Sequence, residues 1–174
     1  MSLAEAAAAM QARVVGADGR AEIRFDGVST DTRTAGKGQL FVAIRGERHD
    51  GHDFLAAARD RGAAAALVDE RHATALSHKR HQSALSHERH EGAAAPLPLL
   101  VADDTRLALG RLGRHWRLRF APALIAITGS NGKTTTKEML ASILRRHAGE
   151  SGVLATRGNL NTEIGVPLTL LGLR

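Results

Sequence analysis

Residues 124–135 read Leu-Ile-Ala-Ile-Thr-Gly-Ser-Asn-Gly-Lys-Thr-Thr, and this stretch decides the fold class of the chain. The four apolar residues at 124–127 predict a short buried strand, and the residues after Lys133 have the apolar spacing of a helix. A glycine-rich turn between a strand and a helix is typical of α/β proteins that bind phosphate groups at the helix N-terminus. The simplest alternative is a glycine turn before an ordinary helix.

Each residue type in this turn suits a nucleotide phosphate. Gly129 and Gly132 allow the backbone to turn so that its N–H groups face phosphate oxygens. Lys133 is long enough to reach β- and γ-phosphates, and the hydroxyl group of Thr134 is a ligand type for Mg²⁺. The general phosphate-loop pattern also needs a glycine five residues before Gly132, where this chain has Ile127. The strict form of the pattern is therefore not met.

The preceding part of the chain predicts a β-α-β unit. The apolar run at 40–44 predicts a buried strand, and the run at 65–68 predicts a second one. Between them we expect a helix over 54–61, with Asp53 as its N-cap and Gly62 at its end. Two strands joined by a helix at this spacing indicate an α/β domain.

Two further helices have N-cap signals. Ser2 is followed three residues later by Glu5, which predicts a helix over 3–12 with a capping box. Asp104 predicts another helix, after a strand at 97–101. Pro122 follows that helix and marks a domain junction. We therefore expect an N-terminal domain at 1–119 and the beginning of a second domain at 120–174.

Composition excludes several classes of protein. The chain has 174 residues, of which 43% are apolar, enough for a buried core. It has no cysteine, which excludes disulfides and cysteine-bound zinc. No apolar run is long enough to cross a bilayer, and the N-terminus lacks the features of a signal peptide. The net charge is +6, but the basic residues are spread along the chain without an aromatic platform, so we expect no nucleic-acid partner.

A nine-residue repeat interrupts the predicted N-terminal domain. Residues 70–78 are echoed at 79–87, with a partial third copy at 88–90, and five of the nine histidines lie in 70–90. One interpretation is a metal-binding tract. We favour a solvated, histidine-rich insertion at 71–95, because no carboxylate or cysteine stands at a fixed ligand spacing within the repeat.

Three stretches together resemble the Mur ligase family. The stretch 127–139 resembles the ATP loop of that family, which has Thr-Gly-x-x-Gly-Lys-Thr where the strict pattern has an earlier glycine. The segments at 29–33, 38–46 and 50–54 resemble the N-terminal domain that binds the UDP end of the cell-wall precursor. The stretch 156–171 resembles the branch of the family that adds D-alanyl-D-alanine.

This resemblance implies a fold, an activity and two cofactors. The fold would be α/β: a Mur-ligase substrate domain, then the start of a P-loop-containing central ATPase domain, with the C-terminal domain absent. The activity would be ligation of D-alanyl-D-alanine to UDP-N-acetylmuramoyl-tripeptide through an acyl phosphate, using ATP and Mg²⁺. We expect a cytoplasmic protein without membrane insertion, inactive as this chain alone. The alternatives are a non-catalytic remnant that only binds the UDP precursor, and the related ligase that adds the third amino acid.

The resemblance also assigns site residues. Catalytic roles fall to Lys133 and Thr134, and Thr134 would also contact Mg²⁺. The residues expected to bind ATP form one loop: Thr128, Gly129, Ser130, Asn131, Gly132, Lys133, Thr134 and Thr135. The residues expected to bind the precursor are Ser29, Asp31, Arg33, Arg45, His52, Asn159, Asn161 and Thr162. The alternative for Ser29, Asp31 and Arg33 is a surface turn with an ion pair, and for the last three it is turn chemistry.

Overall fold

The computed structural model describes residues 1–16, 22–76, 97–158 and 160–174. The chain divides into two compact units, Met1–Leu109 and Gly110–Arg174. The helix α4 (Thr105–Arg117) begins in the first unit and ends in the second. Most of the predicted histidine-rich insertion, from residue 77 onward, lies outside the described residues, whereas residues 70–76 are helical.

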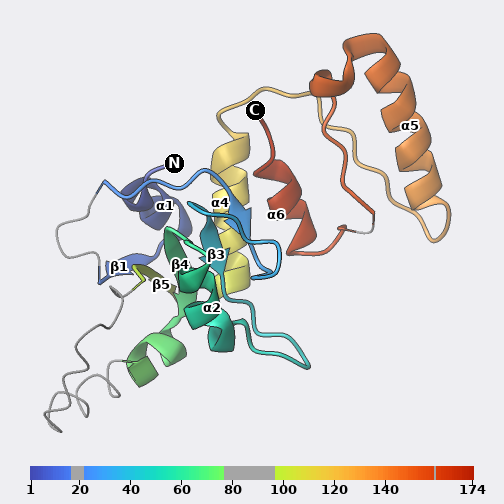
Figure 1. Cartoon of the computed structure of the whole chain (residues 1–174). Helices are drawn as coiled ribbons and strands as arrows, with labels where there is room; N and C mark the ends of the chain where they lie inside the picture. The colour runs from blue at the N-terminus through green and yellow to red at the C-terminus, as the bar shows by residue number, and fades with distance from the viewer. Residues whose placement is uncertain (17–21, 77–96, 159) are drawn as a thin grey trace, which may run out of the picture. The chain divides into compact units, whose positions relative to one another are not determined.

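The first unit is built on a mixed five-stranded sheet (Figure 1). The strands are β1 (Arg13–Val15), β2 (Val28–Ser29), β3 (Leu40–Val42), β4 (Ala65–Asp69) and β5 (Leu99–Ala102), in the order β1-β5-β4-β3-β2. The strands β2 to β5 are parallel, and β1 runs antiparallel to β5. The predicted β-α-β unit is confirmed, because β3 pairs with β4 in parallel.

Both faces of the central strands are buried, which explains their continuous apolar sequences. Phe41 pairs with Ala66, which pairs with Leu99, so these three side chains share one face of the sheet. That face packs in one cluster with Ala58 of α2 (Leu55–Asp60) and with Ala73. The residues next to these in the sequence face the other side of the sheet, and they too are fully buried: Leu40, Leu67 and Leu100.

The helix ends differ from the predictions in ways that the caps explain. Helix α1 (Leu3–Met10) begins as predicted, with the N–H of Glu5 donating to Ser2 Oγ at 3.2 Å. It ends two residues early because Gln11 adopts a left-handed conformation. The prediction that Asp53 caps a helix at 54–61 is wrong. A 3-10 turn (Gly51–Phe54) comes first and is capped by Asp50, so Asp53 lies inside it.

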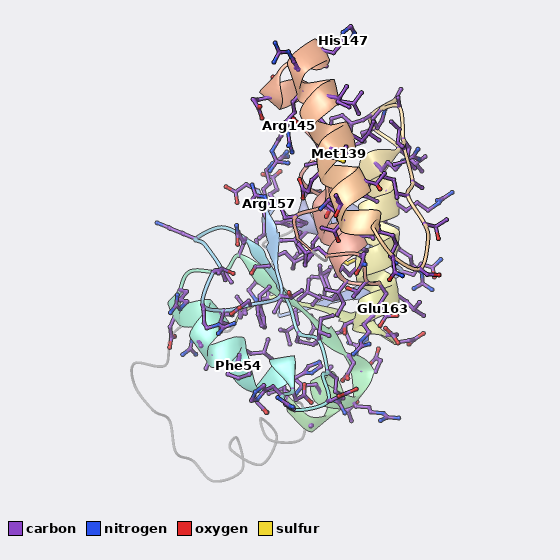
Figure 2. All side chains as sticks on the ribbon, turned by 90° about the vertical axis from the view of Figure 1, so that its right-hand side faces the viewer. Phe54, Met139, Arg145, His147, Arg157 and Glu163 are labelled. Carbon is purple, nitrogen blue, oxygen red and sulfur yellow. The ribbon has the colours of Figure 1, made fainter. Side chains whose placement is uncertain are left out.

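The second unit contains α5 (Lys133–Ala148), the 3-10 turn Glu150–Gly152 and α6 (Gly165–Leu170). The strand predicted at 124–127 is wrong: Leu124 and Ile125 are 65% and 55% exposed and form no ladder. A strand needs a partner for its backbone hydrogen bonds, and the described residues of this unit contain no strand. Met139 on α5 (Figure 2) is also exposed, at 63%.

Candidate functional site

A depression of about 390 Å³ lies where β4 and β5 end and α4 begins. Its lining carries charges of both signs: Arg45, Asp69, Glu70, Arg71, Asp103, Asp104, Thr105 and Arg106. The carboxyl ends of parallel strands are the usual ligand-binding edge of an α/β sheet. The Asp104 carboxylate caps α4, accepting the N–H groups of Arg106 at 2.7 Å and Leu107 at 2.9 Å.

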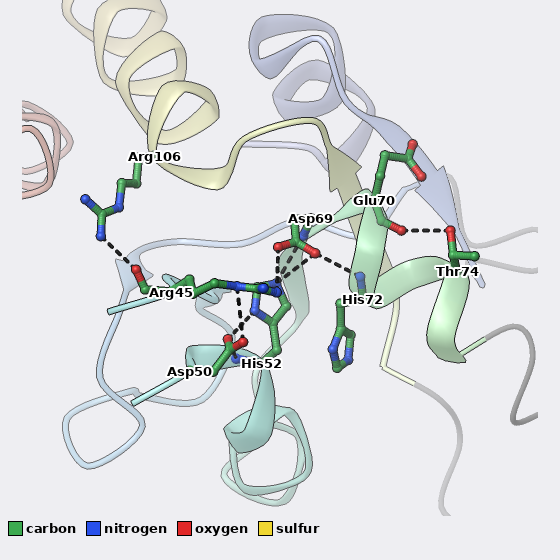
Figure 3. A network of polar contacts seen from close by, with 8 residues as sticks. All are labelled: Arg45, Asp50, His52, Asp69, Glu70, His72, Thr74 and Arg106. Carbon is green, nitrogen blue, oxygen red and sulfur yellow. Dashed lines mark hydrogen bonds and ion pairs between the residues drawn. The ribbon is translucent and has the colours of Figure 1, made fainter. Parts of the chain in front are cut away.

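Arg45 is held from several directions at this edge (Figure 3). Its Nε lies 3.2 Å from Asp50 Oδ2, and its Nη2 donates to Asp69 Oδ2 at 3.0 Å. Its backbone carbonyl accepts a hydrogen bond from Arg106 Nη2 at 2.7 Å. Arg45 and Asp50 also form an isolated antiparallel bridge, which closes the turn between them. Both the backbone and the guanidinium group of Arg45 are therefore fixed.

His52 lies beneath this arrangement and is only 3% exposed. The backbone N–H of Asp69 donates to His52 Nε2 at 3.1 Å, so that nitrogen is an acceptor. The proton of the neutral ring is then on Nδ1, which lies 2.5 Å from Asp50 Oδ1. Burial by itself would raise the pKa of Asp50, but the hydrogen bonds from the backbone and ring of His52 outweigh it, and the pKa is lowered.

His72 stacks on His52, with ring centroids 4.7 Å apart and the planes inclined by 30°. Its backbone N–H donates to Asp69 Oδ1 at 2.8 Å. The pKa of His72 is lowered, first by burial and then by the neighbouring His52 ring. Its Nε2 is buried without a hydrogen-bond partner. Sequence reasoning placed His72 in the histidine-rich insertion, but its side chain is part of the folded unit.

Ser29, Asp31 and Arg33 form a second cluster in the first unit. Ser29 Oγ donates to the carbonyl of Asp31 at 3.0 Å, and Arg33 Nη2 lies 2.6 Å from Asp31 Oδ2. The hydrogen bonds from the Arg33 side chain and backbone lower the pKa of Asp31 to about 2. The Arg33 side chain is 86% exposed. This is the geometry of a surface turn with an ion pair, and it leaves the arginine accessible to a ligand.

The glycine-rich turn at 128–135 is exposed and leads directly into α5. Gly132 is the N-cap with φ 75°, and Gly129 has φ 151°; both are conformations that favour glycine. The first backbone hydrogen bond of the helix runs from the N–H of Thr136 to the carbonyl of Gly132, at 2.9 Å. The N–H groups of residues 133–135 are therefore available at the helix N-terminus. Lys133 Nζ donates back to the carbonyls of Gly129 and Ser130.

The segment at 156–162 is tied to α5 and α6. Lys137 Nζ donates to the carbonyls of Thr156 and Gly158, so the segment lies beside α5. Thr162 Oγ1 accepts the N–H of Gly165 at 3.1 Å at the start of α6, which is the turn chemistry considered above. Asn161 is exposed, and Asn159 lies outside the described residues.

The structure places some of the predicted site residues in contact with one another, and it shows further residues in the same network that were not predicted. It brings Arg45 and His52 into one network, and it keeps the turn at 128–135 next to the helix that the sequence predicts. Sequence reasoning missed Asp50, Asp69 and Arg106, which hold Arg45. One available signal was the position of Asp69 at the carboxyl end of a predicted strand.

Comparison with known proteins identifies the family. The profile of the Mur ligase family catalytic domain matches residues 24–117, more than half of the chain. The chain belongs to the Mur ligase family. The profile of the Mur ligase middle domain matches residues 127–174. The resemblance inferred from the sequence is therefore confirmed at the level of the family.

The relatives of this Mur ligase chain are longer than the chain. The UDP-N-acetylmuramoyl-tripeptide–D-alanyl-D-alanine ligase of Haemophilus influenzae is 38% identical over 174 residues, covering 99% of this chain and 33% of that protein. A crystal structure of MurF from Acinetobacter baumannii matches with TM-score 0.75 and 38% identity, again over 99% and 33%. MurF from Thermotoga maritima in complex with ADP matches with TM-score 0.60 and 30% identity, over 86% and 29%. The chain thus spans about a third of the length of these relatives.

None of the helices in the described ranges combines the length and apolar composition needed to cross a membrane. The described residues also contain no group of three or more histidine, cysteine, aspartate or glutamate side chains that could hold a metal ion. Neither interpretation of the repeat, the favoured solvated insertion or the metal-binding tract, is tested, because most of the repeat lies outside the described ranges.

Proposed function

We propose that this Mur ligase chain supplies the precursor-binding and phosphate-binding parts of an enzyme that ligates D-alanyl-D-alanine to UDP-N-acetylmuramoyl-tripeptide in the cytoplasm. The observation that carries the proposal is the turn at 128–135, which presents Lys133 and the helix N–H groups together. It is supported by the relationship to D-alanyl-D-alanine ligases over 99% of the chain. The assignment of a domain boundary at 119 belongs to this proposal.

The residues of the turn fit a nucleotide. Gly132 has no heavy atom within 4 Å of the place where a Cβ would stand, and the turn around it is exposed. Gly129, Ser130, Asn131 and Gly132 would surround the phosphates with Thr128 at the start of the turn. Lys133 and Thr135 would contact phosphate oxygens, and the hydroxyl group of Thr134 would hold Mg²⁺. MgATP would supply an activated phosphoryl group to the precursor.

The electrostatic setting supports the same assignment. The unit Gly110–Arg174 contains ten Lys and Arg residues and three Asp and Glu residues, a net charge of +7. The unit Met1–Leu109 has a net charge of −1 by the same count. The basic residues are spread over both units, as expected, with 14 in the first and ten in the second, whereas 15 of the 18 acidic residues lie in the first unit. The excess positive charge of the second unit therefore comes from its scarcity of acidic residues. A positive field raises the local concentration of an anionic nucleotide.

The first step of the proposed reaction brings two anions together, the precursor carboxylate and the ATP phosphates, so their negative charge must be neutralised. The terminal carboxylate of the precursor attacks the γ-phosphorus, ADP leaves, and an acyl phosphate forms. The amine of D-alanyl-D-alanine then attacks the acyl carbon, and phosphate leaves as the amide bond forms. In the first step Lys133 and the N–H groups of the turn stabilise negative charge that accumulates on the phosphoryl oxygens. In the first unit Ser29, Asp31, Arg33 and Arg45 would hold the precursor. In the second unit Asn161 and Thr162 are assigned to precursor binding by the family resemblance alone.

The test is a calorimetric titration of the 174-residue chain with UDP-N-acetylmuramoyl-tripeptide, and separately with MgATP, at one fixed ionic strength. We expect saturable binding of the precursor that is weakened roughly tenfold or more by Arg33→Ala, because a charged contact is lost. Arg59→Ala is the matched control, since Arg59 is another arginine with an ion pair, to Asp60. For MgATP, Lys133→Met is compared with Arg146→Met.

The outcomes separate the two roles. Precursor binding without ATP binding would support a chain that only binds the precursor, an alternative favoured by the absence of a strand from the described part of the second unit. A folded chain that binds neither compound would contradict the proposed function.

A further inference from the structure

The residues of the network around Arg45 differ in exposure. Some can contact a ligand, and others are buried and can only support them. The Arg45 side chain is 49% exposed and lines the depression, whereas the His52 side chain is 1% exposed. Both ring nitrogens of His52 are occupied, Nε2 by the Asp69 N–H and Nδ1 by the Asp50 carboxylate. His52 therefore has neither an exposed surface nor a free polar atom for a ligand.

His52 does control the two carboxylates that hold Arg45. One oxygen of Asp50 contacts the His52 ring, and the other faces Arg45 Nε. The second carboxylate belongs to Asp69, whose backbone N–H is anchored by the same ring. A buried ring that bonds to both of these residues fixes where the guanidinium group can sit.

We propose that His52 is a positioning residue that holds Arg45, through Asp50 and Asp69, as the contact for an anionic group of the precursor in the depression. This inference rests on the proposed function. A guanidinium group has five N–H donors. Nη2 donates one to Asp69, and Nε faces Asp50 in an ion pair at 3.2 Å. The two donors of Nη1 and the second donor of Nη2 remain for a phosphate or a carboxylate.

The surrounding charges are compatible with an anion. Acidic side chains of the depression have partners within the fold: Asp69 with Arg45, Glu70 with Arg13 at 2.7 Å, and Asp104 with the α4 N-terminus. Two further arginines, Arg71 and Arg106, line the same depression. An anion would therefore meet three arginines, and three of the four lining carboxylates are already held by hydrogen bonds or ion pairs. The fourth, Asp103, is exposed to solvent.

The experiment measures the affinity of the full chain for UDP and for UDP-N-acetylmuramoyl-tripeptide by calorimetry. We expect Arg45→Ala to weaken binding roughly tenfold to a hundredfold, the loss typical of a charged hydrogen bond. A loss with both compounds places the contact at the diphosphate, and a loss with the precursor alone places it at a carboxylate. His52→Leu should cause a similar loss, and the double variant should bind about as well as Arg45→Ala alone.

Two conservative variants separate positioning from a general effect on folding. His52→Asn places an amide donor near the Nδ1 position and should keep most of the affinity by holding Asp50. His52→Gln places its amide near the Nε2 position and should lose it. His72→Leu is the matched control, because His72 contacts the His52 ring but its side chain holds neither carboxylate; it should leave the affinity unchanged.

The results distinguish a failure of the proposed function from a failure of the positioning role of His52. A chain that binds neither UDP nor the precursor overturns the proposed function, and this inference with it. If the wild-type chain binds the precursor and Arg45→Ala binds it with the same affinity, only this inference is overturned. Additive losses from Arg45→Ala and His52→Leu, or equal losses in the Asn and Gln variants, would also overturn it, because His52 would then act independently of Arg45.

Discussion

The cap of α4 should carry a measurable share of the stability of the first unit. Replacing Asp104 by alanine removes an oxygen that accepts two N–H groups, those of Arg106 and Leu107. Losing a capping side chain costs about 1 kcal/mol, and losing a carboxylate at a helix N-terminus costs about 0.3–1 kcal/mol more. We expect a decrease of about 1–2 kcal/mol in the free energy of unfolding, or roughly 3–6 °C in Tm for a chain of this size.

The assay is urea denaturation followed by far-UV circular dichroism and by the fluorescence of Trp116, the single tryptophan. Trp116 lies near the other end of α4, with its Nε1 donating to the carbonyl of Leu173 at 3.0 Å. Asp103→Ala is the matched control, because Asp103 is an exposed neighbouring carboxylate outside the cap. Asp104→Asn keeps an acceptor without the charge and separates the two contributions.

One result would refute this reasoning. If Asp104→Ala and Asp103→Ala destabilise the chain equally, within about 0.3 kcal/mol, the two hydrogen bonds contribute nothing beyond a surface charge. A decrease confined to Asp104→Ala, with Asp104→Asn intermediate, would confirm that the cap fixes the start of α4. That start forms one wall of the depression.

Two predictions concern pH. The folded pKa of Asp31 is about 2, below its ordinary 3.8, so its pairing with Arg33 stabilises the fold above about pH 4, and this contribution is lost as the pH falls towards 2. Arg33→Gln should return the pKa of Asp31 towards 3.8 in an NMR titration; an unchanged value would contradict the pairing. The pKa of His72 is lowered from 6.5, so the unfolded chain takes up its proton first and stability falls as the pH drops below 6.5. His72→Leu should reduce the difference between urea midpoints at pH 7 and pH 5, and an identical difference in the variant would refute the assignment.

The predictable parts of the fold are those whose conformation depends on residues close together in the sequence. The cap of Ser2 and the strands at 40–42 and 65–69 follow from short-range spacing and apolar runs, and the structure has them close to the predicted places. The same reasoning failed at Asp53, because Asp50 was equally able to cap and the chain turned there first. Local sequence does not rank two competing caps three residues apart.

The remaining features depend on contacts between distant residues. The apolar run at 124–127 has the composition of a strand, but a strand forms only with a partner, which composition does not reveal. His52 was predicted from the family resemblance as a precursor contact. Its burial depends on Asp69, seventeen residues away, and on the stacking of His72. The conformation of the turn at 128–135 was the easiest to predict, since its glycines, Lys133 and helix are consecutive in the sequence, whereas its phosphate-binding role stays a prediction.

The order of strands has a consequence for association between molecules. The two outer strands are among the shortest, with three residues in β1 and two in β2. They offer little unpaired backbone on which another chain could extend the sheet. The apolar segment that begins at Leu124 is different, because its side chains are exposed and no described strand pairs with it. Aggregation at high concentration would therefore begin at this segment, and a soluble form of the chain would be engineered there rather than at the edges of the sheet.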